Sequence, residues 1–257
     1  MATLYKRLVE FFTPTSALSD SDLGKIVSVG HCAEVRTAGS SDKVAKCIKI
    51  GLLHDNLSST RKDIRTWQKL RHPNLVKCLG TSECPDYLYI LLENCQGGSL
   101  RKFLNGRTCS VSRIKSIAAD ILAGLNWLHS HKIVYGVLKP SHILFKGPSA
   151  LLADFASARS EYTLENYVYY AAPETIEGSP SQAGDLWALG VTLFLASTGK
   201  LPFNGIDTEE VIQSIQQNEP NWSLLPEELS PLIQGLLKKD PSRRSTALEA
   251  LEFLYSK

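Results

Sequence analysis

The spacing of hydrophobic residues changes along the chain and predicts two regions of different secondary structure. Up to about residue 92, runs such as 43–50 and 87–92 combine alternation with β-branched and aromatic side chains. This pattern favours the strands of a small antiparallel sheet. Beyond Gly97 and Gly98, apolar residues recur at three- and four-residue spacing across 114–128, which predicts a long helix with one apolar face. The chain therefore has the pattern of an α+β fold with a β-rich first part and a larger helical second part.

Proline-containing turns separate three more predicted helices, at residues 205–220, 229–239 and 245–255. Residues 1–22 precede the first predicted strand and include the apolar stretch 8–12. Two alternatives stay open for this N-terminal extension: it packs on the β-rich part, or it is a mobile tail.

Composition indicates one globular domain. The chain has 257 residues, of which 43% are hydrophobic, so it can bury a large core. Lys and Arg total 28 against 26 Asp and Glu, and this balance argues against a nucleic-acid partner or an anionic membrane surface. The longest apolar run, residues 187–196, is too short to span a bilayer, and no signal-peptide core follows the N-terminus. We therefore expect a cytoplasmic protein.

The cysteines show no C-x-x-C pairing and all lie in the first half of the chain. They are Cys32, Cys47, Cys78, Cys84, Cys95 and Cys109. This usage is typical of reduced thiols, and a disulfide framework and a zinc site are the alternatives.

Short motifs along nearly the whole chain resemble those of the protein kinase superfamily. Residues 135–145 have the frame of the kinase catalytic loop, and Asp154-Phe155-Ala156 stands in the place of the D-F-G motif. The other matches, in family order, are the turn at 70–76, the hinge at 92–100, Ala172-Pro173-Glu174, the helix motif at 185–190 and the element at 240–244.

The resemblance implies a bilobal kinase-like domain at residues 23–257, preceded by the extension at 1–22. The small β-rich N-lobe is expected at about 23–92 and the helical C-lobe at about 97–257. Within the superfamily, the loop with Tyr135 in the His place and the segment 184–190 resemble the Fused and Unc-51-like serine/threonine kinases.

The catalytic loop keeps its frame but lacks the residues of the family's chemistry. Val137 stands where the family has the Asp that accepts the substrate proton, and its side chain has no lone pair. His142 stands where an Asn holds the second Mg²⁺, which removes a hard oxygen ligand. These two replacements predict a chain that is not an enzyme, with no catalytic residue.

The nucleotide site that the resemblance implies is also altered. Of the three glycines in the family's phosphate loop only Gly30 remains, because Ser28 and Ala33 fill the outer positions. Val35 closes the same motif. A β-turn without a ligand is the alternative for this loop.

The next strand offers Lys46 and Lys49 for the family lysine that holds the α- and β-phosphates, and Lys46 fits the spacing better. Counting back from His72 gives Asp63 as its helix partner, one methylene shorter than the usual Glu. A solvated lysine and a solvated aspartate are the alternative.

Further residues that the resemblance places at the nucleotide are Glu93 and Cys95 in the hinge, and Lys139, which approaches the γ-phosphate in the family. Asp154 is the remaining metal ligand, and a local turn cap is the alternative for it. The cofactors implied are ATP and Mg²⁺, and the altered loops predict weak binding of ATP or no binding of either.

The activation segment also departs from the family. Tyr167 replaces the Thr that hydrogen-bonds the catalytic Asp, so both partners of that bond are missing, and Gly136 replaces the Arg that reads a phosphorylated segment. The scaffold is kept: Glu174 and Arg244 are expected to form an ion pair, and Asp185 is expected to brace the catalytic-loop backbone.

These observations predict a pseudokinase that acts as a protein-binding scaffold or allosteric regulator. Its partner is expected to be another protein, such as an active kinase or a cytoskeletal or signalling protein. The alternatives are an active serine/threonine kinase with displaced catalytic residues, in which another carboxylate or a water replaces the base, and a structural scaffold that binds no nucleotide.

Overall fold

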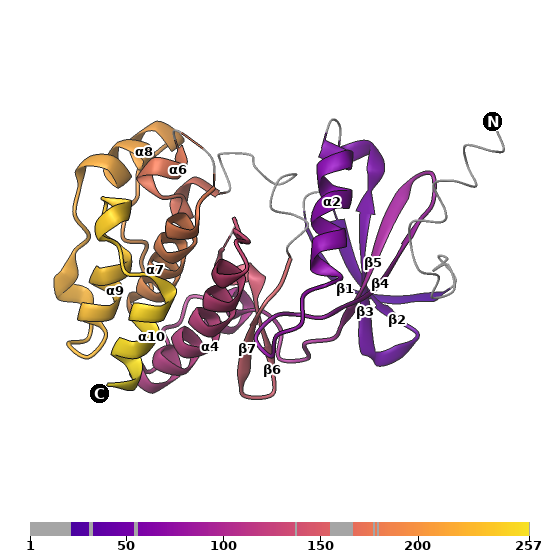
Figure 1. Cartoon of the computed structure of the whole chain (residues 1–257), viewed down its shortest axis with the longest axis horizontal. Coiled ribbons are helices and arrows are strands. Elements are labelled where there is room, and N and C mark those ends of the chain that lie inside the picture. The colour runs from indigo at the N-terminus through magenta and orange to yellow at the C-terminus, as the bar shows by residue number, and fades with distance from the viewer. Residues whose placement is uncertain are drawn as a thin grey trace. The chain divides into compact units, whose positions relative to one another are not determined.

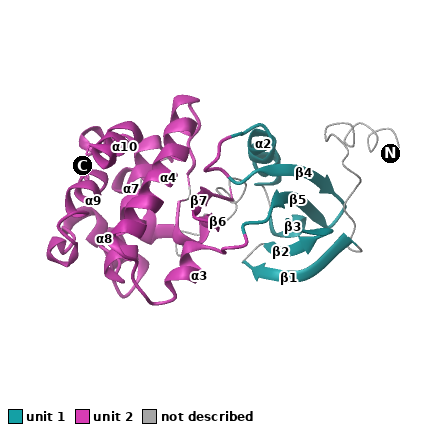
Figure 2. Ribbon diagram, turned by 90° about the horizontal axis from the view of Figure 1, so that it is seen from below, with its two compact units in different colours: residues 1–71, 76–95, 159–161 teal, residues 72–75, 96–158, 162–257 magenta. Residues whose placement is uncertain are grey.

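The computed structural model describes residues 22–30, 33–53, 56–136, 138–154, 167–176, 178 and 180–256. These residues form two compact units, shown in different colours in Figure 2. Of the described residues, unit 1 holds those up to Arg71 together with 76–95, and unit 2 holds 72–75 and those from Gln96 onward. Residues 1–21 of the predicted N-terminal extension lie outside the described residues.

Unit 1 is built on a five-stranded antiparallel sheet with the order β1-β2-β3-β5-β4. The strands are β1 (Leu23–Val29), β2 (Ala33–Ala38), β3 (Ser40–Lys49), β4 (Cys78–Glu83) and β5 (Tyr87–Glu93). The central strands β3 and β5 are the two that alternation predicted most clearly, at 43–50 and 87–92. Residues 44–48 of β3 are buried on both faces, as expected of a strand with neighbours on each side.

The helix α2 (Leu57–Trp67) runs alongside this sheet, as Figure 1 shows. Its apolar side chains Ile64 and Trp67 are fully buried. The Trp67 indole Nε1 donates to the carbonyl of Val76 over 2.7 Å, so its polar atom is satisfied although the ring lies in the core. At the helix surface, the Arg61 Nε donates to Glu83 of β4 over 3.1 Å. Both faces of α2 are thus fixed within unit 1.

Unit 2 is mainly helical. Its helices are α3 (Leu100–Leu104), α4 (Val111–Ser130), α6 (Pro173–Ile176), α7 (Gln182–Thr198), α8 (Thr208–Gln217), α9 (Ser230–Leu236) and α10 (Ala247–Tyr255). The short 3-10 helices of the two units are η2 (Ile50–Leu52), η4 (Pro140–His142), η5 (Val168–Tyr170), η6 (Trp222–Leu224) and η7 (Pro241–Arg243). The predicted long helix is α4, and it packs against α7, α10 and the strand β7.

The helix α7 forms the centre of this unit. It contains the apolar run 187–196 and is buried along most of its length, which explains why its hydrophobic residues lie on every side. Among the residues that the structure describes, no helix is long and apolar enough to cross a membrane.

Three predicted helices are shorter than their sequence patterns suggested. α8 begins only after Asp207, whose carboxylate accepts from the amide of Glu210 over 2.9 Å. α10 begins after Thr246, which forms a capping box with Glu249. A side chain that caps the first turn fixes the helix start, and an apolar periodicity alone does not reveal it.

A two-stranded hairpin, β6 (Ile143–Lys146) and β7 (Ser149–Leu152), completes unit 2. Its register pairs Ile143 with Leu152, so the residues just outside the hairpin, His142 and Asp154, lie at the same end. Asn74 fastens β7, because its side chain donates to Ala150 and its carbonyl accepts from the Leu152 amide. The hairpin therefore has little freedom to change its register.

The hinge glycine Gly97 contacts this hairpin at close range. Its amide donates to the carbonyl of Phe145 over 3.0 Å. A Cβ atom on Gly97 would lie 2.6 Å from the Phe145 Cβ and 2.9 Å from its carbonyl oxygen. Only glycine allows this approach between two backbones.

We predict that Gly97→Ala destabilises the protein by about 1–3 kcal/mol, because the new methyl group overpacks a backbone contact. Thermal and urea unfolding of the purified protein measure the effect. Gly51→Ala is the matched control, since a Cβ at Gly51 meets nothing within 4 Å. An equal, small change in both variants would mean that the hairpin moves aside at no cost.

Candidate functional site

A loop in unit 2 joins α4 to β6, and one buried carboxylate holds its backbone. Asp185 of α7 accepts hydrogen bonds from the amide of Tyr135 over 2.9 Å and from the amide of Gly136 over 2.7 Å. His129, near the end of α4, places its Nε2 at 2.8 Å from the same carboxylate. The predicted brace is therefore confirmed, and His129 is a partner that the sequence did not suggest.

Two tyrosines tie this loop to its neighbours. The Tyr135 hydroxyl donates to the carbonyl of Ala153, directly before Asp154. The Tyr167 hydroxyl donates to the carbonyl of Gly136 over 2.8 Å. The side-chain bond of the family is replaced here by a bond from Tyr167 to the loop backbone, which the sequence did not suggest.

The end of the β6–β7 hairpin brings an imidazole next to a carboxylate. His142 Nε2 lies 3.4 Å from Asp154 Oδ2, and the His142 side chain is only 4% exposed. The carbonyl of His142 accepts from the amide of Ala153 over 2.9 Å, which links the two backbones directly. The hairpin register thus sets the distance between His142 and Asp154.

Asp154 has a left-handed backbone conformation, with φ 69°. Asp is one of the few non-glycine residues that tolerate this region, at a cost of about 1–2 kcal/mol. Residues held in such conformations cluster at functional sites. A metal-binding role for Asp154 stays a prediction, because Asp also adopts this conformation in turns.

Lys139 begins the turn that carries His142. It is half-buried, and its carbonyl accepts from the amide of His142 over 2.9 Å. Lys139, His142 and Asp154 thus belong to one local arrangement in unit 2. Val137, Phe155 and Ala156 lie outside the described residues.

The other predicted nucleotide residues belong to unit 1. Lys46 of β3 is paired in register with Val35 of β2, which puts the two side chains on one face of the sheet. Lys46 is 6% exposed, whereas Lys49 is exposed at the end of the strand. Of the two lysines, the structure therefore favours Lys46 for a defined site.

Four further predicted residues lie in unit 1. Gly30 closes a turn, with its amide donating to Ala33 over 2.7 Å. Asp63 lies on α2 and is half-buried. The carboxylate of Glu93 accepts from the amide of Lys77 over 2.8 Å, and Cys95 is buried. A role for these residues in nucleotide binding stays a prediction.

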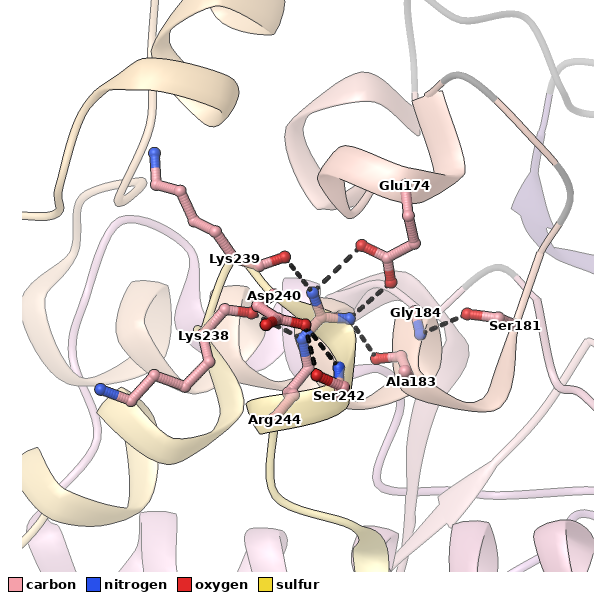
Figure 3. A network of polar contacts seen from close by, with 9 residues as sticks. All are labelled: Glu174, Ser181, Ala183, Gly184, Lys238, Lys239, Asp240, Ser242 and Arg244. Atoms are coloured by element: carbon pink, nitrogen blue, oxygen red, sulfur yellow. Dashed lines mark hydrogen bonds and ion pairs between the residues drawn. The ribbon is translucent and has the colours of Figure 1, made fainter.

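A network around Arg244 connects α6, α7 and the segment 238–244, as Figure 3 shows. Its guanidinium binds the Glu174 carboxylate with two hydrogen bonds, of 2.6 and 3.1 Å. It also donates to the carbonyls of Ala183, Lys238 and Lys239. The Arg244 Cζ lies 5.1 Å from the centre of the Trp187 ring. The predicted ion pair is confirmed, and every guanidinium nitrogen has an acceptor.

Metal ligands are sparse in the part of the chain that the structure describes, where no group of three or more His, Cys, Asp or Glu could hold an ion. No disulfide joins the described cysteines, which are Cys47, Cys78, Cys84, Cys95 and Cys109. Burial raises the pKa of the Cys78 thiol to about 11, so this sulfur is inert rather than nucleophilic. Cys32 lies outside the described residues.

Residues 23–256 match the protein kinase domain model, and the chain belongs to this family. It is 33% identical over 241 residues to calcium-dependent protein kinase 6 of Plasmodium berghei, covering 87% of this chain and 16% of that protein. It is 29% identical over 246 residues to calcium/calmodulin-dependent protein kinase type 1B of Rattus norvegicus, covering 88% of this chain and 72% of the relative.

A third relative, serine/threonine-protein kinase 36 of Pongo abelii, is 29% identical over 209 residues, or 76% of this chain and 16% of that protein. The chain thus spans about a sixth of two of these relatives. Among solved structures, Rad53 1–466 in complex with AMP-PNP is similar with a TM-score of 0.79 and 26% identity, over 90% of this chain and 64% of that one. The bilobal kinase fold is confirmed; the likeness to Fused and Unc-51-like kinases stays a prediction.

The prediction that the chain is not an enzyme is wrong. Its relatives are named protein kinases, its structural neighbour is a kinase with a bound ATP analogue, and no described residue shows a loss of catalysis. Val137 in the place of the family Asp does not by itself exclude catalysis, because positioning and electrostatics supply most of the catalysis in phosphoryl transfer. Lys46, Lys139 and Asp154, which serve those purposes in the family, are present.

We predict that Arg244→Ala destabilises the protein by on the order of 3 kcal/mol, because it breaks a buried, bidentate ion pair and removes a contact with Trp187. Thermal unfolding measures the change. Arg243→Ala is the matched control. Arg243 is exposed, so its replacement should change the free energy of unfolding by less than about 0.5 kcal/mol. Equal stability of the two variants would contradict a bracing role for the network.

Proposed function

We propose that this domain is an ATP-dependent protein kinase that transfers a phosphoryl group to a hydroxyl side chain of another protein. The observation that carries the proposal is the left-handed Asp154, fixed beside the buried His142 at the end of the β6–β7 hairpin. A left-handed acidic residue in this position destabilises the fold, and residues with such strained backbones cluster at ligand-binding and active sites.

ATP is the expected cofactor. In unit 1, the buried Lys46 and the adjacent Val35 offer a cation beside an apolar surface, which suits a phosphate next to a nucleobase. In unit 2, Lys139 adds a second cation. The AMP-PNP complex of Rad53, 26% identical to this chain, supports the same ligand class.

One Mg²⁺ fits the residues that are present. Mg²⁺ takes oxygen ligands and is bound in kinases by one or two carboxylates together with substrate phosphates. Asp154 supplies one carboxylate, whereas the imidazole of His142 is a poor ligand for this ion. When bound, the ion neutralises charge on the phosphate oxygens. The Lys139 ammonium stabilises negative charge on the group that is transferred.

Val137 supplies no base, so proton removal from the substrate hydroxyl falls to another carboxylate or to water. General bases contribute about 10²–10⁴-fold to such reactions, and we therefore expect a slow kinase rather than an inert one. We place it in the cytoplasm, where ATP and reduced thiols coexist, in agreement with the absence of disulfides among its described cysteines. A protein-binding, regulatory use of the same domain is the second candidate.

We predict that ATP raises the melting temperature of the protein by a few degrees at most. A ligand at ten times its Kd adds about 1.4 kcal/mol to the stability of the folded state. Lys46→Ala should abolish most of the shift. Lys49→Ala, which changes an exposed lysine on the same strand, should preserve it.

Transfer of label from radiolabelled ATP to a generic protein substrate tests the proposed phosphoryl transfer. Incorporation should fall at least about tenfold in Asp154→Asn, because the carboxylate that holds the cation is lost. No thermal shift with millimolar ATP would contradict the whole proposal. A shift without any incorporation would leave the regulatory candidate.

A further inference from the structure

The carboxylate of Asp154 has an imidazole nitrogen as its neighbour. His142 Nε2 and Asp154 Oδ2 are 3.4 Å apart, and the imidazole is buried. The backbones that carry the two side chains are held together, because the amide of His142 donates to the carbonyl of Lys139 and its carbonyl accepts from the amide of Ala153. The pair is thus a preformed feature of the hairpin end.

The distance between the two atoms suits a shared metal ion. Two donors that each lie about 2.1 Å from one ion are about 3.0 Å apart in octahedral and about 3.4 Å apart in tetrahedral coordination. The observed 3.4 Å falls at the upper end of this interval. It is long for a strong hydrogen bond between an imidazole and a carboxylate, which is usually below about 2.9 Å.

The chemistry of the pair disagrees with Mg²⁺ as its preferred ion. Mg²⁺ selects oxygen ligands and loses its water reluctantly, whereas imidazole nitrogen suits divalent transition ions. The described residues contain no cluster of three metal-binding side chains, so the protein supplies two ligands and a bound nucleotide must supply more. This inference therefore rests on the proposed function.

We propose that His142 and Asp154 together bind one divalent transition-metal ion, of the Mn²⁺ or Co²⁺ type, in preference to Mg²⁺ when a nucleotide is bound. Nε2 and Oδ2 are the protein ligands, and phosphate oxygens and water complete the coordination. His142 in the place of the family Asn thereby changed the metal preference of the site and did not abolish metal binding.

The experiment measures metal binding without catalysis. The full chain is saturated with AMP-PNP and titrated separately with Mg²⁺, Mn²⁺ and Co²⁺, with the free Mn²⁺ signal in electron paramagnetic resonance and the thermal shift as readouts. We expect Mn²⁺ to bind at least about tenfold more tightly than Mg²⁺, and Co²⁺ more tightly still, following the order of affinities for sites with a nitrogen ligand.

The matched variants are His142→Asn and His131→Asn. His142→Asn should reduce the Mn²⁺ preference at least about fivefold, because the amide offers oxygen in place of nitrogen. The exposed His131→Asn should leave the preference unchanged. If His142 only positions Asp154 through a hydrogen bond, Asn preserves that bond and the metal preference stays as it is, which overturns the proposal.

The wild-type titration decides the question even if His142→Asn does not fold. Equal affinity for Mg²⁺ and Mn²⁺ in the wild-type chain overturns the metal proposal. A parallel titration of AMP-PNP in EDTA distinguishes failure of the metal proposal from failure of the proposed function. Nucleotide binding with no metal preference contradicts only the metal site, whereas no binding of AMP-PNP under any condition contradicts both it and the proposed function.

Discussion

A single buried carboxylate, that of Asp185, positions the loop that carries the candidate chemistry. It receives two backbone amides and the imidazole of His129. A carboxylate that is 1% exposed must have such partners, because removing it from water without them is very costly. Because α7 is buried in the core of unit 2, the carboxylate of Asp185 holds these loop amides in a fixed position. The backbone at Tyr135 and Gly136 is thus fixed before any ligand arrives.

The tyrosines show how the same scaffold is kept with different side chains. Tyr135 and Tyr167 each use a hydroxyl to bond a backbone carbonyl, at Ala153 and Gly136. A backbone acceptor is present whatever the neighbouring side chain is. Contacts of this kind survive replacement of the family's residues, which explains how the loop keeps its connections although its motif has changed.

The relationship to protein kinases and the altered catalytic loop are compatible with each other. Within unit 1, Lys46 is buried in the sheet, and within unit 2, the Asp154 carboxylate lies beside the imidazole of His142. In the proposed kinase, loss of one base lowers the rate of a reaction that relies on positioning, and the proposed metal role of His142 concerns which ion is used. His142 is therefore more informative about this protein than the absence of an aspartate at position 137.

The sequence by itself determined the fold class, the family and the strongest elements. Alternation predicted β3 and β5, and three- and four-residue periodicity predicted α4, because these patterns follow directly from the geometry of strands and helices. The ion pair of Glu174 with Arg244 also followed from the resemblance to the kinase family. Only the tertiary structure decided contacts between distant residues: His129 with Asp185, Tyr167 with Gly136, and His142 with Asp154. No local pattern encodes these pairs, because the register of a hairpin and the packing of α4 on α7 set their distances.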